Sequence, residues 1–326
     1  MLTENLTREE FSQIYKDQFL PILIPLEEKR KIDVKKSKPF EILCAIFGLS
    51  FIITSFLQGD IFTIISIVSL ILLIITFVIA ANVCPGIRDN LKKEVITKIL
   101  SLFGKFYLLT ENDVITKDDI QGMGLFPSFT NKYDDDIIVG IHKGVNFAIS
   151  ETHLSHSEQV GKSSNTIDDF YGLILKIQMN KKFTGKTIVG INNKIRKLKG
   201  FEQVNLEDVE FTKNMKVFST DQVEARYILT PAFMQRLYEL GNFFTNTREA
   251  LANNPNSAAF SQRHILVSAA FIDGYVYLFV PANDNFFEIS EKESLLNEYK
   301  YYDVYCQIQL ILSIVEYLKL DMKLGL

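Results

Sequence analysis

The stretch from Val217 to Leu237, VFSTDQVEARYILTPAFMQRL, brings together side chains that could act on a ligand. Asp221, Glu224 and Arg226 lie within six consecutive residues, and we expect all three on one short helix. In a cleft, two carboxylates and a guanidinium could clamp a polar ligand. At the start of a helix, the aspartate would instead stabilise the positive helix end, and the arginine would pair with an acidic neighbour. We favour this structural interpretation and keep the three residues as a candidate ligand cluster.

Two other groups of side chains resemble metal ligands at first sight. His153 and His156 are three residues apart, but the surrounding pattern predicts a strand, where such residues point to opposite faces. Asp134, Asp135 and Asp136 could offer oxygen ligands to a hard cation such as Mg²⁺. They precede a predicted strand, and we expect a turn and a solvated loop there. Neither group therefore predicts a metal site.

The remaining motifs predict no cofactor and no catalytic residue. GMGLF, at residues 122–126, lacks the third glycine and the acidic residue of a dinucleotide site and the lysine of a phosphate-binding loop. No G-x-S-x-G motif occurs in the sequence. Cys44, Cys84 and Cys306 form neither a disulfide framework nor a zinc-binding spacing, which fits a reducing compartment. The net charge of −4 gives no reason to expect a nucleic-acid partner.

A long apolar run near the N-terminus predicts a membrane anchor. Phe40 to Leu57 is mostly apolar, and Ile61 to Val83 contains no charge, so each stretch is long enough for a bilayer span of roughly 20 residues. Gln58, Gly59 and Asp60 separate the two stretches. Glycine permits a sharp turn, and an aspartate is best placed at the water interface. The sequence therefore predicts a transmembrane helical hairpin with a very short loop.

Basic side chains flank the open end of this hairpin, and its tip has none. Basic residues near span ends are retained on the cytoplasmic side, so both termini are expected in the cytoplasm and the protein in the cell inner (plasma) membrane. The same side chains could contact anionic lipid headgroups. These possible lipid-facing residues are Lys35, Lys36 and Lys38 before the hairpin and Arg88, Lys92 and Lys93 after it.

Helices and strands alternate irregularly outside the apolar run. Thr7 and Glu10 have the spacing of a capping box, and Pro21 and Pro25 are expected to end or kink the helix that follows. Beyond residue 105, the segments DIIVGI, VNFAISETHL, FYGLILKIQM and KTIVGIN predict antiparallel strands. Asp273 with the glycine after it predicts a tight hairpin between two more strands.

Three helices are expected in the second half of this domain. The segment VFSTDQVEARYIL is expected to form a helix with a capping box at Ser219 and Gln222, and a second helix to begin at Thr230 and Pro231. The apolar spacing from residue 290 to 320 predicts a long helix on the sheet. Strands and helices without regular βαβ alternation predict an α+β domain with an antiparallel sheet packed by helices.

The expected organisation has four parts. Residues 1–39 form an N-terminal amphipathic helix and a basic juxtamembrane segment, and residues 40–83 form the transmembrane hairpin. Residues 84–104 form a juxtamembrane helix, and residues 105–326 form the cytoplasmic α+β domain.

The stretch DQVEARYILTP, from Asp221 to Pro231, also carries a family resemblance. Together with the hairpin, FTGKTIVG and FIDGYVYLFVP, it resembles uncharacterised bacterial two-span membrane proteins defined only by a domain of unknown function. The resemblance implies the architecture described above. It implies no activity, cofactor or catalytic residue.

Two hypotheses about function follow from the sequence. The preferred one is a membrane-anchored binding or scaffold module that contacts lipid headgroups or a protein partner, including a second copy of the chain, without catalysis. The alternative is a membrane-tethered enzyme that acts on a phospholipid or a nucleotide. An enzyme requires titratable groups that converge in one concave site, whereas an interaction module requires an exposed apolar patch.

Overall fold

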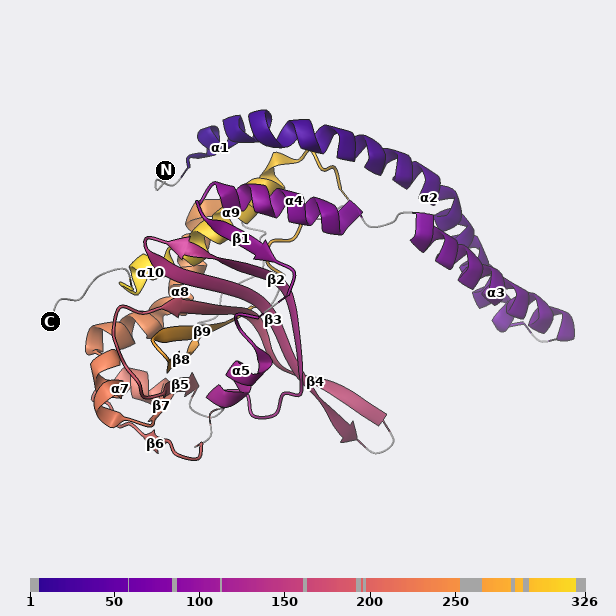
Figure 1. The fold of residues 1–326 in the computed structure, drawn as a ribbon. Coiled ribbons are helices and arrows are strands. Elements are labelled where there is room, and N and C mark those ends of the chain that lie inside the picture. Colours follow the sequence, from indigo (N-terminus) through magenta and orange to yellow (C-terminus); the bar gives the residue numbers. More distant parts are fainter. Residues whose placement is uncertain are drawn as a thin grey trace. The chain divides into compact units, whose positions relative to one another are not determined.

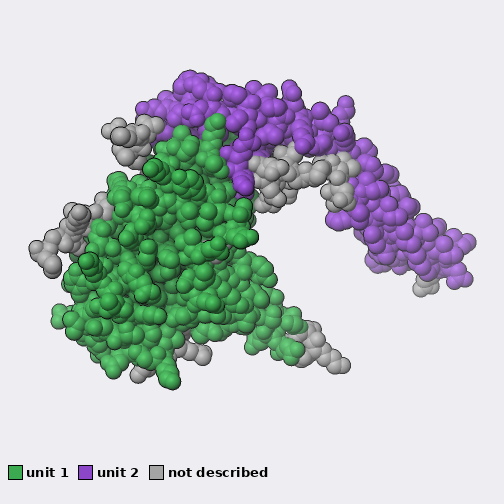
Figure 2. All heavy atoms as spheres, in the orientation of Figure 1, with its two compact units in different colours: residues 1–5, 96–288, 301–326 green, residues 6–95, 289–300 purple. Residues whose placement is uncertain are grey.

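The chain forms two compact units in the computed structural model (Figure 2). One unit comprises residues 1–5, 96–288 and 301–326, and the other comprises residues 6–95 and 289–300. The structure describes residues 6–320 except 58, 84–86, 112, 161–162, 192–194, 196–197, 253–265, 283–284 and 290–292. We refer to the first as the sheet unit and to the second as the helical unit.

The helical unit begins with three consecutive helical segments. They are α1 (Arg8–Ile14), the π-helical turn η1 (Tyr15–Phe19) and α2 (Leu20–Ser55). The capping box expected at Thr7 and Glu10 is present, which confirms the predicted helix start. The helix does not end at Pro21 or Pro25, because α2 continues past both of them to Ser55. Pro21 stands in the first turn, where a helix needs no hydrogen bond from its backbone nitrogen.

The second half of α2 pairs with α3 (Asp60–Val83) as the expected hairpin (Figure 1). Short polar side chains join the two helices: Ser50 Oγ lies 3.0 Å from Ser69 Oγ, and Cys44 Sγ donates to Thr76 Oγ1 at 3.2 Å. Large apolar side chains of both helices are exposed. Small polar residues between helices and apolar residues outside are typical of membrane-embedded helix pairs. Both helices are long and apolar enough to cross a membrane, judged by length and composition.

A short C-terminal segment of the chain completes the helical unit. Glu298 forms an ion pair with Arg8 at 3.2 Å, and it accepts a hydrogen bond from the hydroxyl of Ser12 at the same distance. Glu27 accepts a hydrogen bond of 2.9 Å from the backbone nitrogen of Leu295. These contacts hold residues from opposite ends of the sequence together within one unit.

The sheet unit is built on one antiparallel nine-stranded sheet (Figure 1). Its strand order is β1-β2-β3-β4-β9-β8-β5-β7-β6, so the C-terminal hairpin β8–β9 is inserted between β4 and β5. The strands are β1 (Phe106–Leu109), β2 (Asn131–His142), β3 (Val145–Val160), β4 (Ser163–Gln178), β5 (Thr187–Ile191), β6 (Glu202–Gln203), β7 (Met215–Ser219), β8 (Ser268–Ile272) and β9 (Tyr275–Pro281).

Apolar side chains on both faces of the sheet are buried. On one face, Ile120 and Met123 of α5 pack in a cluster with Ile174 of β4 and Phe279 of β9. On the other face, the ring of Phe233 in α8 lies 5.8 Å from that of Phe271 in β8. The remaining helices are α4 (Ile87–Ser101), α5 (Lys117–Met123), α6 (Val209–Asn214), α7 (Gln222–Ile228), α8 (Pro231–Ala252), α9 (Glu298–Leu312) and α10 (Ile314–Tyr317).

This architecture confirms the predicted α+β class with helices packed on an antiparallel sheet. The predicted hairpin turn is also confirmed, because Asp273 and Gly274 have φ angles of 52° and 79° between β8 and β9. Asparagine, aspartate and glycine tolerate this left-handed conformation best, so the local sequence determined the turn.

Two predicted helices have different boundaries in the structure. Val217, Phe218 and Ser219 belong to strand β7, and the helix after them is capped by Asp221 rather than by a capping box at Ser219. The long C-terminal helix begins at Glu298, eight residues later than expected, and Leu295 is buried in the segment before it. In both cases the apolar spacing predicted a helix that was too long, because it included buried residues that lie outside the helix.

Candidate functional site

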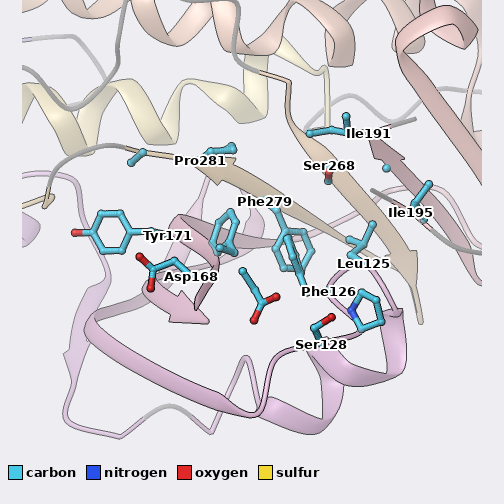
Figure 3. A pocket seen from close by; sticks show the side chains of 15 residues that line it. Leu125, Phe126, Ser128, Asp168, Tyr171, Ile191, Ile195, Ser268, Phe279 and Pro281 are labelled. Atoms are coloured by element: carbon cyan, nitrogen blue, oxygen red, sulfur yellow. The ribbon is translucent and has the colours of Figure 1, made fainter. Parts of the chain in front are cut away.

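A partly apolar cavity of the sheet unit has a volume of about 480 Å³ (Figure 3). Its walls come from the segment after α5, the first half of β4, strand β5 and the ends of the β8–β9 hairpin. The lining residues are Leu125, Phe126, Pro127, Ser128, Asp168, Asp169, Phe170, Tyr171, Gly190, Ile191, Ile195, Ser268, Phe279, Pro281 and Ala282. We call this space the acidic cavity.

Three aromatic rings form the apolar part of the acidic cavity. The ring of Phe126 lies 5.2 Å from those of Phe170 and Phe279, and the latter two rings are 5.8 Å apart. Tilted and edge-to-face rings at these distances attract one another beyond the effect of burial. The phenylalanines therefore form a stable apolar surface against which a hydrocarbon group can pack.

Two adjacent aspartates provide the charge of the acidic cavity. In the β3–β4 pairing, Leu154 faces Phe170 and Ser155 faces Asp168, so Asp169 is an extra, bulged residue. A bulge changes the direction of side chains, and here both carboxylates line the same cavity. None of the fifteen lining residues is a lysine, an arginine or a histidine.

An imidazole fixes each of these carboxylates. His153 Nε2 lies 2.8 Å from Asp168 Oδ1, and His156 Nδ1 lies 2.7 Å from Asp169 Oδ2. The two histidines therefore contact different carboxylates, as expected for strand residues that point to opposite faces. Neither aspartate was expected as a site residue from the sequence. The repeated acid at the start of β4, beside two histidines in the preceding strand, is the signal that could have indicated them.

A second bulge brings three carboxylates together on β2 and β3. Asp134 faces Thr152 and Ile137 faces Ser150, so Asp135 and Asp136 both stand opposite the single residue Glu151. Oxygens of these three side chains lie within 4.8 Å of one another. The expectation of a turn and solvated loop at this place is wrong, because all three aspartates belong to strand β2 and Asp136 is buried.

The protonation of Glu151 reflects this crowded environment. Burial raises the pKa of Glu151 to about 7, against the hydrogen bonds that it accepts from Tyr171 and from the backbone of Phe286, and the charges of Asp136 and Asp135 raise it further. Three carboxylates at such distances have the donor atoms of a hard-cation site. A proton on Glu151 relieves the same repulsion at neutral pH. Asp134 is outside this trio, because its carboxylate accepts hydrogen bonds from Ser150 and Thr152.

The candidate cluster in the stretch from Val217 to Leu237 is divided among separate partners. Asp221 caps α7 by accepting hydrogen bonds from Val223 and Glu224 at 2.8 and 3.0 Å. Arg226 is exposed and donates to the backbone oxygen of Gln222 at 3.0 Å. In the part of the chain that the structure describes, no ion pair joins Arg226 to either acid.

Glu224 instead binds the loop between β4 and β5. Its carboxylate accepts hydrogen bonds from the backbone nitrogens of Thr184 at 3.1 Å and Gly185 at 2.6 Å. A β-carbon at Gly185 would lie 2.8 Å from Glu224 Oε2, which explains why a glycine stands there. The two segments FTGKTIVG and DQVEARYILTP are thus in direct contact through this carboxylate.

The basic residues near the hairpin lie on two helices of the structure. Lys35, Lys36 and Lys38 are exposed on α2. On α4, Lys93 is exposed and Lys92 is largely buried, while the side chain of Arg88 lies outside the described residues.

Residues 168–320 match the model of a family described as "Protein of unknown function (DUF3137)". The expected resemblance to a domain of unknown function is confirmed over these residues, which do not include the hairpin. The matched segment starts at Asp168 of the acidic cavity and contains the contact between Glu224 and Gly185.

Comparisons with individual proteins add no activity. No curated protein matches the chain. Among solved structures, the crystal structure of the mycobacterial trehalose monomycolate transport factor A, TtfA, aligns with 68% of this chain and 97% of its own at 9% identity and a TM-score of 0.32. A TM-score of this size carries no argument about function.

Proposed function

We propose that this protein is a membrane-anchored binding module whose ligand occupies the acidic cavity. The anchor is the α2–α3 hairpin, whose two helices have the length and composition of membrane spans. Basic residues beside the hairpin favour the cell inner (plasma) membrane with both termini in the cytoplasm. Lipid headgroups at these residues, and a protein partner or a second copy of the chain, are further contacts of the same module.

The ligand proposed for the acidic cavity is an amphiphile with a hydrocarbon group and an ammonium group. The observation that carries this proposal is the placement of Asp168 and Asp169 beside the rings of Phe126, Phe170 and Phe279. A concave apolar surface with a few convergent polar groups is the usual form of a small-ligand site. Because the lining residues carry negative charge alone, an ammonium group complements them and an anionic headgroup does not.

The charge preference of the cavity can be measured with short-chain lipids. In the full-length protein in detergent, dihexanoyl phosphatidylethanolamine should raise the melting temperature more than dihexanoyl phosphatidylglycerol. The double variant Asp168→Asn/Asp169→Asn should lose this preference. Glu158→Gln, which changes an exposed acid on β3, should keep it. Equal stabilisation by both lipids in the unchanged protein would contradict the proposed ligand.

The proposed topology can be tested by labelling. With Cys44, Cys84 and Cys306 replaced by alanine, a cysteine at Gln58 should react with a membrane-impermeant thiol reagent in intact spheroplasts. The same reagent should reach a cysteine at the exposed position Lys182 of the sheet unit after lysis alone. Labelling of Lys182→Cys in intact spheroplasts would reverse the proposed orientation.

The alternative is a membrane-tethered enzyme that acts on a phospholipid or a nucleotide. The carboxylates of Asp135, Asp136 and Glu151 favour it, because Mg²⁺ bound by carboxylates commonly holds substrate phosphates. Under this alternative, Mg²⁺ should support hydrolysis of a phosphate ester by the full-length protein, and Asp136→Asn should abolish it. Absence of turnover with both substrate classes would leave the binding module as the function.

A further inference from the structure

A small cavity beside the start of α8 in the sheet unit is lined by three cationic side chains. It has a volume of about 60 Å³ and lies between the loop after β4, the start of α8 and the segment after α10. Lys181, Arg236 and Lys319 supply its positive charge, and Thr230 and Asn180 supply uncharged polar groups. None of its lining residues is an aspartate or a glutamate. We call this space the basic cavity.

The cations of the basic cavity are not neutralised by carboxylates. Lys181 Nζ donates to the backbone oxygen of Tyr227 at 2.6 Å. The same nitrogen lies 4.6 Å from the centre of the Tyr227 ring. Among the described residues, no acidic side chain forms an ion pair with Lys181, Arg236 or Lys319. Like charges around one cavity repel one another, and a bound anion would offset this repulsion.

Arg236 provides the most specific indication of a missing acceptor. Its Nε atom is buried and has no hydrogen-bond partner among the described residues. A buried donor without an acceptor is destabilising, and for a charged group the penalty is larger than for a neutral one. Guanidinium groups bind phosphate and carboxylate oxygens with two parallel hydrogen bonds, one of which commonly uses this atom.

The backbone conformation of Lys319, an exposed residue, and the partial burial of Lys181 point in the same direction. Lys319 has a φ angle of 56°, in the left-handed region that favours glycine, so a lysine side chain is held there at a cost in strain. Burial lowers the pKa of Lys181 below its usual value, because it disfavours the charged form of the side chain. A bound anion would favour the charged lysine.

We propose that the basic cavity binds the phosphoryl group of a phosphomonoester, either a soluble metabolite or the headgroup of an anionic lipid. Lys181, Arg236 and Lys319 would surround the phosphate oxygens, with the hydroxyl of Thr230 as a further donor. A volume of about 60 Å³ is of the size of one phosphoryl group. This site is separate from the acidic cavity and does not depend on the function proposed for it, because the two cavities share no lining residue.

The site can be tested by calorimetric titration of the full-length protein in detergent. Glycerol 3-phosphate should bind, and Arg236→Gln should weaken its Kd about tenfold or more, since loss of one charge-assisted hydrogen bond has an effect of that order. Lys181→Gln should weaken it similarly. Lys182→Gln, which removes an equal charge from the exposed neighbouring residue, should leave the Kd within about twofold.

Stability without ligand separates a binding role from a structural one. Because Arg236 Nε lacks an acceptor, Arg236→Gln should keep or raise the melting temperature in phosphate-free buffer while abolishing the rise that glycerol 3-phosphate produces. In a second arm, nanodiscs that contain phosphatidic acid are compared with nanodiscs that lack it. Binding of the phosphatidic acid, and not of the soluble ester, identifies a lipid as the source of the phosphoryl group. Failure of both probes to bind, or equal binding by the Arg236→Gln variant, would overturn the proposal.

Discussion

Glu27 of the helical unit and Glu151 of the sheet unit are both almost fully buried, with exposed fractions of 2% and 3%. Their pKa values nevertheless move in opposite directions. Hydrogen bonds from Arg30 are the main cause that lowers the pKa of Glu27 to about 2, with a contribution from the backbone of Leu295 and against the effect of burial. Burial raises the pKa of Glu151 to about 7, and the charges of the acids Asp136 and Asp135 raise it further.

The difference teaches which buried charge has a structural role. Both nitrogens of the Arg30 fork that bind Glu27 are 2.8 Å from its two oxygens, and the Leu295 nitrogen lies 2.9 Å away, so the carboxylate is compensated. Among the described residues, the carboxyl group of Glu151 accepts hydrogen bonds from neutral donors, Tyr171 and the Phe286 backbone, and it lies beside like charges. Compensation holds two segments together, whereas an uncompensated acid indicates a group whose charge depends on a proton or a cation.

The largest expected effect comes from removing the compensated charge. Glu27→Gln removes the buried carboxylate that accepts from the Arg30 fork and the Leu295 amide, and it should lower the free energy of unfolding by about 3 to 5 kcal/mol. Hydrogen exchange at the Leu295 amide should accelerate, because this nitrogen loses its charged acceptor. Glu28→Gln, at the exposed neighbouring position, should change neither quantity. Unchanged exchange at Leu295 in Glu27→Gln would show that the carboxylate does not hold the segment.

The pH dependence of the stabilisation by Glu27 follows from the direction of its pKa shift. The folded pKa of Glu27, about 2, lies below its ordinary value of 4.5. The stabilisation is therefore complete above pH 4.5 and is lost as the pH falls towards 2.

Glu151 should show the opposite sign. Its folded pKa of about 7 lies above the ordinary 4.5, so the folded state holds the proton more tightly and stability falls as the pH rises between these values. The total loss should be roughly 3 kcal/mol, from about 1.4 kcal/mol per pKa unit. Glu151→Gln should remove this slope and be the more stable protein at pH 8, measured by chemical denaturation in detergent. A slope that persists in the variant would assign the titration to another group.

Magnesium gives a second measurement on the same trio. A cation bound by Asp135, Asp136 and Glu151 would favour the ionised carboxylate and so abolish the loss of stability at high pH in the unchanged protein. An effect of Mg²⁺ that remains in Glu151→Gln would place the cation elsewhere.

The sequence was sufficient for features that local chemistry controls. The capping box at Thr7, the apolar hairpin and the turn at Asp273 each depend on residues within a few positions of one another, and all three are present. The periodicity was misleading where a buried apolar segment adopts another conformation, as at Val217 and Leu295. Tertiary packing decides such cases, and spacing alone cannot separate a short buried strand from a helix.

The candidate sites depend on contacts between distant residues and on bulges. Glu27 meets a backbone group 268 positions later, and His142, which had no visible acidic neighbour in the sequence, lies 3.3 Å from Glu316. The bulges in β2 and β4 bring Asp135 and Asp169 beside other acids, and no sequence period indicates a bulge. The residues of both acidic groups were therefore visible in the sequence, but the bulges that bring their carboxylates together were not.

The smallest expected effect separates the members of the cluster Asp221, Glu224 and Arg226. The carboxylate of Glu224 resembles Glu27, because it accepts two backbone hydrogen bonds from a distant loop. Glu224→Gln should therefore cost about 2 kcal/mol, the difference that a charged acceptor makes to such bonds. Arg226→Ala should cost less than about 0.5 kcal/mol, since the bonds of its exposed guanidinium to described residues stay close in sequence, to Gln222. Thermal melts of the two variants measure this order. If Arg226→Ala melts like the unchanged protein but loses ligand binding or the cellular phenotype, the cluster is a ligand site after all. Arg226 would then be required for function without supporting the fold.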